Sequence, residues 1–309
     1  MQKALFLHSK QLRDEAINPI LEKKGNKEVY SNLGLFFENN TGINCNFLET
    51  GALVKDSLYK YLEDNRSNYE TDVLSSEEFS FITSKVQLQK LFERLSLIYS
   101  EIRVLVYLRR QDKHLVSHYQ QASRAPGATS YIYGNEPLAI PEYNENMDLY
   151  LNYYERIGLW GDVFGDNNID IVSFDQVTSS KKGLVNDFFK RIGSNSQVDE
   201  IRDNFSFGKK TTKLKHLSMV VGYTREESFI FNGVLGDDKA KLTPSIASAE
   251  LILSKYQASN MQLVRRFGLV KDDFFSPAMS YPVISNESWS ELEANDVIKC
   301  LLLLLKERL

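Results

Sequence analysis

The sequence predicts an α/β fold with a mostly parallel sheet, helices on both faces and a helical C-terminal portion. Strand-like segments recur at residues 72–76, 102–108 and 169–174. Helix-like segments follow them, including apolar residues at helical spacing over 86–98 and a helix over 183–192. The segment 102–108 is almost continuously apolar, which is typical of a strand covered on both faces. Because strand–helix–strand units usually join parallel strands, the alternation predicts a parallel sheet.

Other elements can be placed between these units. Residues 2–12 have the pattern of a helix, and the polar turn 109–112 opens another, with Asp112 as its expected N-cap. A long loop over 125–145 interrupts the alternation, and loops of this length are often functional. Its tyrosines, which include Tyr133, either line an acceptor groove or anchor the loop.

The C-terminal part is predicted to be helical. One long helix is expected over 243–267 and another over 291–309. The second carries the apolar run 300–305, far shorter than the roughly 20 residues that a membrane-spanning helix needs. We expect it to be a buried docking helix; the other interpretation is a face for self-association.

Composition excludes several classes of protein. The 309 residues carry a formal net charge of −4, with 42 % hydrophobic and 25 % charged residues, which is ordinary globular composition. Non-specific nucleic-acid binding needs a strongly basic face and is not expected. Two cysteines are too few for a disulfide scaffold, which favours a reducing compartment. The first residues break their apolar run too early for a signal peptide, so we expect a cytoplasmic protein without a membrane span.

The turn after residues 102–108 is the most informative stretch. Ligands of open parallel sheets bind outside the carboxyl ends of the strands, where Arg109 and Arg110 lie, and Ser117 follows in the next helix. A guanidinium can hold a phosphate through two hydrogen bonds, a serine hydroxyl can add another, and a helix N-terminus favours anions. The segment is therefore a candidate dianion clamp. The alternative is that the two arginines only solvate the end of a strand.

The segment from Val106 to Tyr119 resembles the 3′-phosphate-binding segment of sulfotransferases. That family has a strand, then Arg-Asn-Pro-x-Asp, then a Ser and a Tyr in the next helix. This chain matches the Arg-to-Ser spacing, the Asp and the Tyr, while Arg110-Gln111 replaces Asn-Pro, as in the bacterial, polysaccharide-associated branch. Less specific blocks of likeness extend over residues 1–278.

This resemblance implies a three-layer fold like that of P-loop nucleoside triphosphate hydrolases over residues 1–278, followed by a C-terminal tail over 279–309. It implies a sulfotransferase that uses 3′-phosphoadenosine-5′-phosphosulfate (PAPS), with Arg109 and Ser117 binding the 3′-phosphate. The sulfuryl group would pass to a hydroxyl, which we expect to belong to a carbohydrate. No metal is expected.

A base is needed to take the proton of the acceptor hydroxyl. Glu77 follows the expected strand 72–76 and is the leading candidate, with Glu78 second. The alternative is that both are first-turn residues that a helix dipole favours. His114 and His118 are four residues apart, but no third metal ligand follows them, and we interpret them as ordinary helix-face residues.

One expected part of the donor site is not found in the sequence. In sulfotransferases a glycine-containing turn with a lysine holds the 5′-phosphosulfate, and neither residues 24–26 nor 41–43 fit that pattern. We therefore expect the first strand and its loop to be lacking from residues 1–278. Two alternatives stay open: a non-catalytic nucleotide-binding remnant of the same fold, or a different nucleotide-using transferase.

Overall fold

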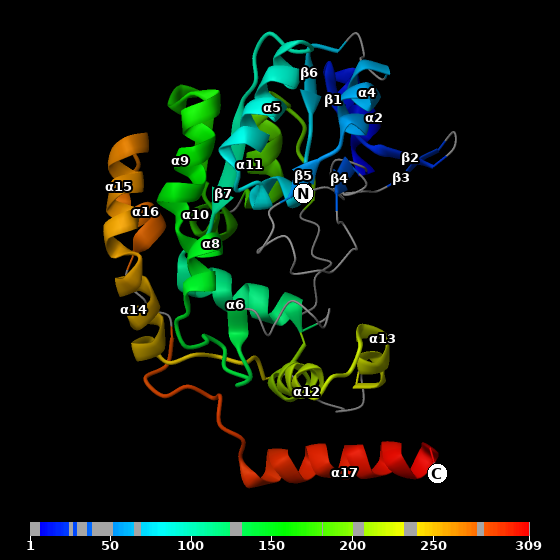
Figure 1. Ribbon diagram of the computed structural model, residues 1–309, viewed down its shortest axis with the longest axis vertical. Helices are drawn as coiled ribbons and strands as arrows, with labels where there is room; N and C mark the ends of the chain where they lie inside the picture. Colours follow the sequence, from blue (N-terminus) through cyan, green and yellow to red (C-terminus); the bar gives the residue numbers. More distant parts are fainter. Residues whose placement is uncertain are drawn as a thin grey trace.

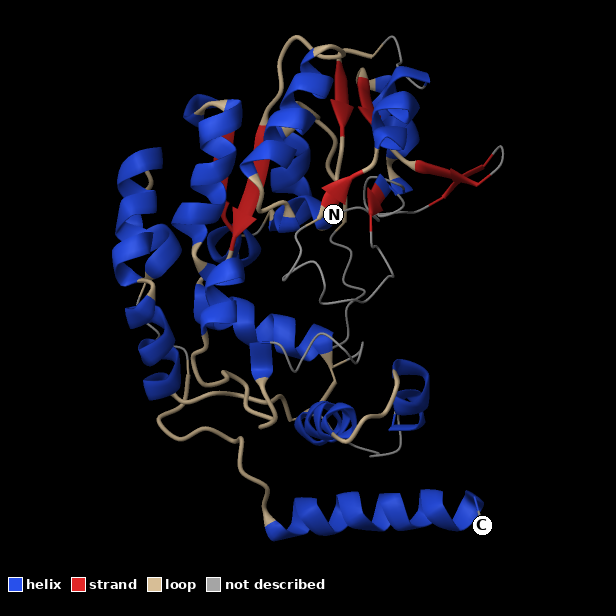
Figure 2. Cartoon of the chain, in the orientation of Figure 1, coloured by secondary structure: helices blue, strands red, loops and turns tan. Residues whose placement is uncertain are grey.

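The computed structural model describes residues 7–24, 27–29, 36–38, 52–64, 69–123, 132–180, 182–199, 207–231, 240–276 and 281–308. Within these residues it is a mixed α/β structure in which helices predominate and the strands are short (Figures 1 and 2). Parts of residues 2–12, 24–26, 41–43 and 125–145 lie outside this description, so the expectations for them apply only in part.

The strands of the described residues form two-stranded sheets, two of them parallel. β1 (Ile17–Pro19) pairs with β6 (Thr71–Val73), and β7 (Val104–Leu108) pairs with β8 (Ile169–Ser173) in a register that joins Val104 to Ile169. The other two pairs are antiparallel: β2 (Glu22–Lys24) with β3 (Lys27–Val29), and β4 (Phe37–Glu38) with β5 (Leu53–Val54). The predicted strand–helix alternation is confirmed, whereas one continuous, mostly parallel sheet is not what the described residues form.

The two parallel pairs nevertheless share one hydrophobic core. Side chains alternate between the two faces of a strand, so Leu105 and Tyr107 of β7 join Ile17 and Val73 in one core. Residues Val104 and Val106 face the other core. The first core is closed by α11 (Gly183–Arg191), and the second by α5 (Lys85–Ser96) and α9 (Tyr153–Phe164). Helices therefore cover both faces of the strands.

β7 differs from the expectation for its segment. The strand was predicted to be buried on both faces, yet Val104 to Tyr107 are only partly buried. The physical reason is its second edge, because within the described residues β7 pairs with β8 alone. That open side contributes to the pocket described below.

The expected C-terminal helix over 243–267 is in fact two helices. α14 (Ile246–Lys255) ends and α15 (Gln257–Phe267) begins at Tyr256, whose φ of −99° and ψ of 4° interrupt the regular helix. The Tyr256 hydroxyl donates to Asp148 Oδ1 at 2.9 Å. Apolar spacing continues across this break, so the sequence pattern did not reveal it.

The remaining helices complete the description. Their bounds are α2 Ser9–Asp14, α4 Asp56–Asp64, α6 Gln111–Ala122, α8 Asp148–Leu151, α10 Phe174–Ser179, α12 Lys209–Val220, α13 Arg225–Ser228, α16 Lys271–Phe275 and α17 Glu291–Arg308, with 3₁₀ turns at Glu78–Phe81, Glu145–Met147, Asp166–Asn168 and Phe229–Phe231. No described helix is both long and apolar enough to cross a membrane.

α17 lies at one end of the molecule, on the side of α12 (Figure 1). It contacts Leu214 of α12 and Phe231 through Val297, which is 9 % exposed. Leu302 and Leu303, in the apolar run expected to dock, are each 60 % exposed. Only one side of the helix is therefore covered by the described residues.

Candidate functional site at the carboxyl end of β7

A cavity of ≈ 430 Å³ opens beside β7 and α6, and it holds part of the predicted clamp. Arg109 and Ser117 both line it, so the structure brings these two sequence-predicted residues to one pocket. Its apolar wall includes Val104, Val106 and Trp160. Its other polar side chains are Ser76, Ser80, Tyr107, His114, Tyr150, Tyr153 and Arg156.

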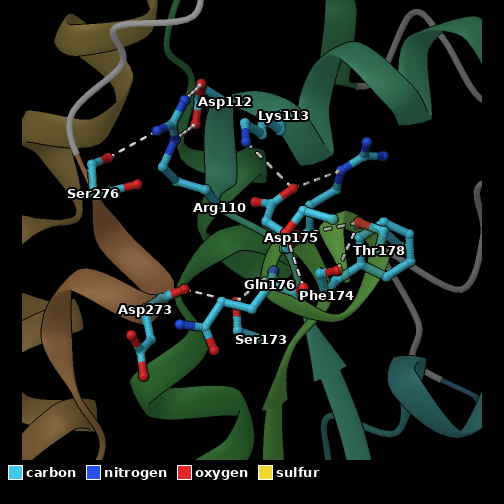
Figure 3. Close-up of polar contacts among 12 residues, drawn as sticks. Arg110, Asp112, Lys113, Ser173, Phe174, Asp175, Gln176, Thr178, Asp273 and Ser276 are labelled. Atoms are coloured by element: carbon cyan, nitrogen blue, oxygen red, sulfur yellow. Dashed lines mark hydrogen bonds and ion pairs between the residues drawn. The ribbon is translucent and has the colours of Figure 1, made fainter. Parts of the chain in front are cut away.

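Arg109 is arranged as a cation with unused hydrogen-bonding capacity. Its guanidinium lies over the Phe174 ring at 4.9 Å, a cation–π contact that fixes its plane. Its Nε is buried, and within the described residues no acceptor hydrogen-bonds to it. The nearest carboxylate oxygen, Asp175 Oδ1, is 3.9 Å away and also lies 3.4 Å from Lys113 Nζ (Figure 3). A buried donor without an acceptor is costly, so the geometry suits an anion bound beside Arg109.

Arg110 is structural instead. Its Nε and Nη2 donate to Asp112 Oδ1 and Oδ2 at 2.6 and 2.8 Å, and its Nη1 donates to the Ser276 carbonyl at 2.8 Å (Figure 3). Arg110 and Asp112 are 3 % and 0 % exposed. The predicted N-cap at Asp112 is wrong: Arg110 holds that position, and Asp112 lies in the first turn, where its carboxylate pairs with Arg110. The pair positions the start of α6 against the chain after α16.

Glu77 is exposed at the start of the 3₁₀ turn Glu78–Phe81. It is not among the residues that line the pocket, although Ser76 and Ser80 on either side of it are. Its charge still reaches the pocket, because burial raises the pKa of Tyr150 to about 12 and Glu77 adds to that rise. Glu78 is buried, and its carboxylate accepts a hydrogen bond from the Ser76 hydroxyl.

His114 was interpreted from the sequence as an ordinary helix-face residue, but it lines the pocket with both ring nitrogens engaged. The Tyr153 hydroxyl donates to the Arg109 carbonyl at 2.8 Å, so its oxygen accepts from His114 Nδ1–H at 2.9 Å. The His114 Nε2 therefore accepts from the Tyr150 hydroxyl at 2.7 Å. Burial lowers the pKa of His114 well below its usual value, helped by His118 and two arginines, so the imidazole is neutral.

Arg156 supplies a second cation to the pocket. Its guanidinium lies over the Tyr150 ring at 5.2 Å and donates to the backbone carbonyls of Tyr150 and Ser80. No role for this residue was expected from the sequence, because α9 has the pattern of an ordinary amphipathic helix. To recognise Arg156 as a pocket residue, one would have to know that α9 and the 3₁₀ turn Glu78–Phe81 meet at the same pocket.

For one tyrosine of the long loop, the structure decides between lining a groove and anchoring the loop. Tyr133 is buried, donates to the Leu115 carbonyl at 2.7 Å and contacts His118 Nδ1 at 3.1 Å. It does not line the pocket, so for this residue the anchoring interpretation is the correct one. Within the described part of the chain, no three His, Cys, Asp or Glu side chains gather as a metal site.

Comparison with known proteins finds similarity to a solved structure. No protein-family model matches the chain, and no curated protein matches its sequence. The chain is similar over most of its length to a bacterial sulfotransferase. The solved structure of the sulfotransferase from Alicyclobacillus acidocaldarius matches with a TM-score of 0.47 and 14 % identity, covering 87 % of this chain and 91 % of that one. That protein bears the name of the family that residues 106–119 resemble, but at this similarity the match carries no conclusion about activity.

Proposed function

We propose that this chain is a sulfotransferase with a P-loop-type three-layer fold, which transfers a sulfuryl group from PAPS to a hydroxyl of a carbohydrate. The observation that carries the proposal is the Arg109 guanidinium, which shares a pocket with Ser117 and has a buried Nε without an acceptor in the described residues. A phosphate dianion accepts strong hydrogen bonds from a guanidinium and a hydroxyl. The 3′-phosphate of the nucleotide fits this pair, as the resemblance of residues 106–119 implies.

When bound, PAPS would supply the sulfuryl group, and this chain's residues would bind it and manage the acceptor proton. Glu77 remains the proposed base, supported by its place in the segment that brings Ser76 and Ser80 to the pocket rim. A carboxylate near a reacting hydroxyl can accept its proton directly or through one water. Glu77→Gln is therefore expected to lower turnover while leaving nucleotide affinity unchanged, and Glu78→Gln is the comparison variant.

The first experiment is calorimetry with adenosine 3′,5′-bisphosphate on the full chain. Arg109→Ala should weaken binding about 10- to 100-fold, because hydrogen bonds to a charged group contribute about 1.5–3 kcal/mol. Ser117→Ala should cost less, since it removes a single hydroxyl. The control is Arg103→Ala, an exposed arginine just before β7. Absence of binding by the unaltered chain, or Arg109→Ala binding as tightly as that chain, would overturn the proposal.

A second ligand tests whether Arg109 contacts the 3′-phosphate of the nucleotide. Adenosine 5′-monophosphate lacks that group, so it should bind more weakly, and Arg109→Ala should then cause little further loss. Equal losses with both ligands would place Arg109 elsewhere on the nucleotide. The alternative function, nucleotide binding without transfer, predicts the same binding results and no release of adenosine 3′,5′-bisphosphate from PAPS with any oligosaccharide acceptor.

A further inference from the structure

Arg156 is a cation that the protein holds in the pocket without neutralising it. Its guanidinium donates to two backbone carbonyls, those of Tyr150 and Ser80, and its other N–H groups have no protein acceptor among the described residues. No described carboxylate forms an ion pair with it, and burial is the main influence on its pKa, which it lowers. Arginines elsewhere differ: Arg110, Arg191 and Arg266 each pair with aspartate.

This arrangement is costly without a ligand. An arginine stays protonated in proteins, and a partly buried charge is unfavourable unless an opposite charge or hydrogen bonds compensate it. The two carbonyls come from separate segments, one after β6 and one before α9, so they fix the guanidinium in place. Arg156 lines a pocket large enough for a small ligand.

The site of Arg156 is separate from the proposed nucleotide clamp but adjacent to it. Arg156 and Arg109 line the same pocket as the neutral His114 imidazole, and both act on it electrostatically. The pocket is also lined by Tyr150, Tyr153 and Trp160, of which Trp160 is only partly buried. Aromatic rings give the apolar face of a sugar a surface to pack on, and a guanidinium binds a carboxylate or a sulfate ester through paired hydrogen bonds.

We propose that Arg156 forms an anion subsite for the acceptor, so that the substrate is a saccharide carrying a carboxylate or a sulfate ester. This inference rests on the proposed sulfotransferase function and specifies its acceptor. The anionic group pairs with the free donors of Arg156, while a neighbouring sugar packs in the apolar part of the pocket, which includes the partly buried Trp160. The acceptor hydroxyl then lies toward Arg109, where the donor nucleotide is expected.

The experiment compares three oligosaccharides by calorimetry on the full chain. One contains glucuronic acid, the second is its carboxyl-reduced glucose counterpart, and the third is the neutral sugar with a sulfate ester. We expect at least one anionic sugar to bind about tenfold or more tighter than the neutral one, since a charged hydrogen-bonded pair is lost without it. Which of the two binds tighter distinguishes carboxylate from sulfate ester.

The variant Arg156→Gln should remove this preference, and the control Arg265→Gln, an exposed arginine on α15, should keep it. Affinity for adenosine 3′,5′-bisphosphate should stay unchanged in Arg156→Gln, which shows that the fold is intact. If Arg156→Gln also loses nucleotide binding, Arg156→Lys decides: a retained preference for the anion supports the subsite, and its loss with normal nucleotide binding overturns it.

Equal binding of all three sugars, binding of none, or a preference that survives in Arg156→Gln would overturn the subsite. Failure of the proposed sulfotransferase function would give a different experimental result. In that case the unaltered chain would not bind adenosine 3′,5′-bisphosphate, while an anion preference that depends on Arg156 could still be measured.

Discussion

Two neighbouring arginines at the end of β7 have opposite environments. Arg110 reaches Asp112 and the Ser276 carbonyl and is almost fully buried, whereas Arg109 turns to the pocket and is 33 % exposed. Both belong to one polar turn in the sequence, which placed them at a strand end without distinguishing them. The difference depends on Ser276, more than 160 residues away along the chain. Only the three-dimensional structure supplies that contact.

The two arginines should therefore differ in their effect on stability. Arg110→Ala leaves the buried Asp112 carboxylate without its partner, and breaking a buried pair this way typically costs 3–5 kcal/mol, so we expect a loss of about 3 kcal/mol. Arg109→Ala should change the free energy of unfolding by less than about 1 kcal/mol, because its charge contacts are looser. Urea unfolding of both variants measures this, and equal losses would contradict it.

The buried histidines of α6 should make stability depend on pH. Burial lowers the pKa of His118 to about 4, and burial also lowers that of His114. In the unfolded chain both titrate near 6.5, so the unfolded state binds more protons as the pH falls. The stabilisation that comes from keeping these histidines neutral in the fold is therefore fully present above pH 6.5. It declines as the pH falls below that value, before most carboxylates titrate.

Urea midpoints measured between pH 7.5 and pH 5 test this dependence. His118→Asn should flatten the decline, and His8→Gln, a residue that packs on Phe189 in another core, should not. A pH dependence that is identical in the unaltered chain and in His118→Asn would show that this histidine is not the cause.

At the scale of elements, α9 and α15 pack closely because of two glycines. A Cβ on Gly161 would lie 2.2 Å from Asp166 Oδ1 and 3.2 Å from the Phe267 ring, while one on Gly158 would meet only the tip of Arg266, at 2.8 Å for the nearest atom. Arg266 itself joins the elements through Asp162 and Asp166, at 2.6 and 2.8 Å. The glycines thus leave space for an ion-pair network that joins α15 to α9 and to the turn that follows α9.

Alanine substitutions should separate the two glycines. In a helix, Ala is favoured over Gly by about 1 kcal/mol. For Gly158→Ala this gain should roughly offset a small shift of the Arg266 tip. For Gly161→Ala the new methyl displaces Asp166 and crowds an aromatic ring, so we expect a net loss of about 1–2 kcal/mol. Thermal unfolding of the two variants checks the order, and a more stable Gly161→Ala would contradict it.

Local patterns predicted the kinds of elements better than their limits. The helix expected over 183–192 is α11, and the strand expected over 169–174 is β8, each within one residue. The break at Tyr256 was missed because apolar spacing continues across it, and the contact of Tyr256 with Asp148 of a distant helix is not visible in the sequence. The same limit applies to the pocket: the sequence pointed to Arg109 and Ser117, while His114 and Arg156 entered it only through contacts between elements.

For the whole molecule, the sequence suggested where the body ends but not how the tail is held. The boundary at residue 278 remains a prediction, yet residues beyond it contact the body at several polar points. Glu287 accepts from the Ala139 amide at 2.6 Å, and Asn286 Oδ1 accepts from the Thr243 amide at 2.8 Å. Lys209 Nζ lies 2.8 Å from Glu293, and this hydrogen bond is the main cause that lowers the Glu293 pKa to about 2.

Two truncations test whether this tail is integral. A chain ending at residue 278 loses every one of those contacts, leaves the buried Lys209 without its carboxylate and uncovers Leu214 and Phe231. Removing a partner from a largely buried charge and opening a core each cost a few kcal/mol, so we expect a loss of about 4 kcal/mol or more. A chain ending at residue 301 keeps Glu287 and Glu293 and removes mostly exposed leucines, so it should lose about 1 kcal/mol. Urea unfolding compares them; equal stability of the two truncated chains would mean that the segment after 278 adds nothing to the core and is a separate tail.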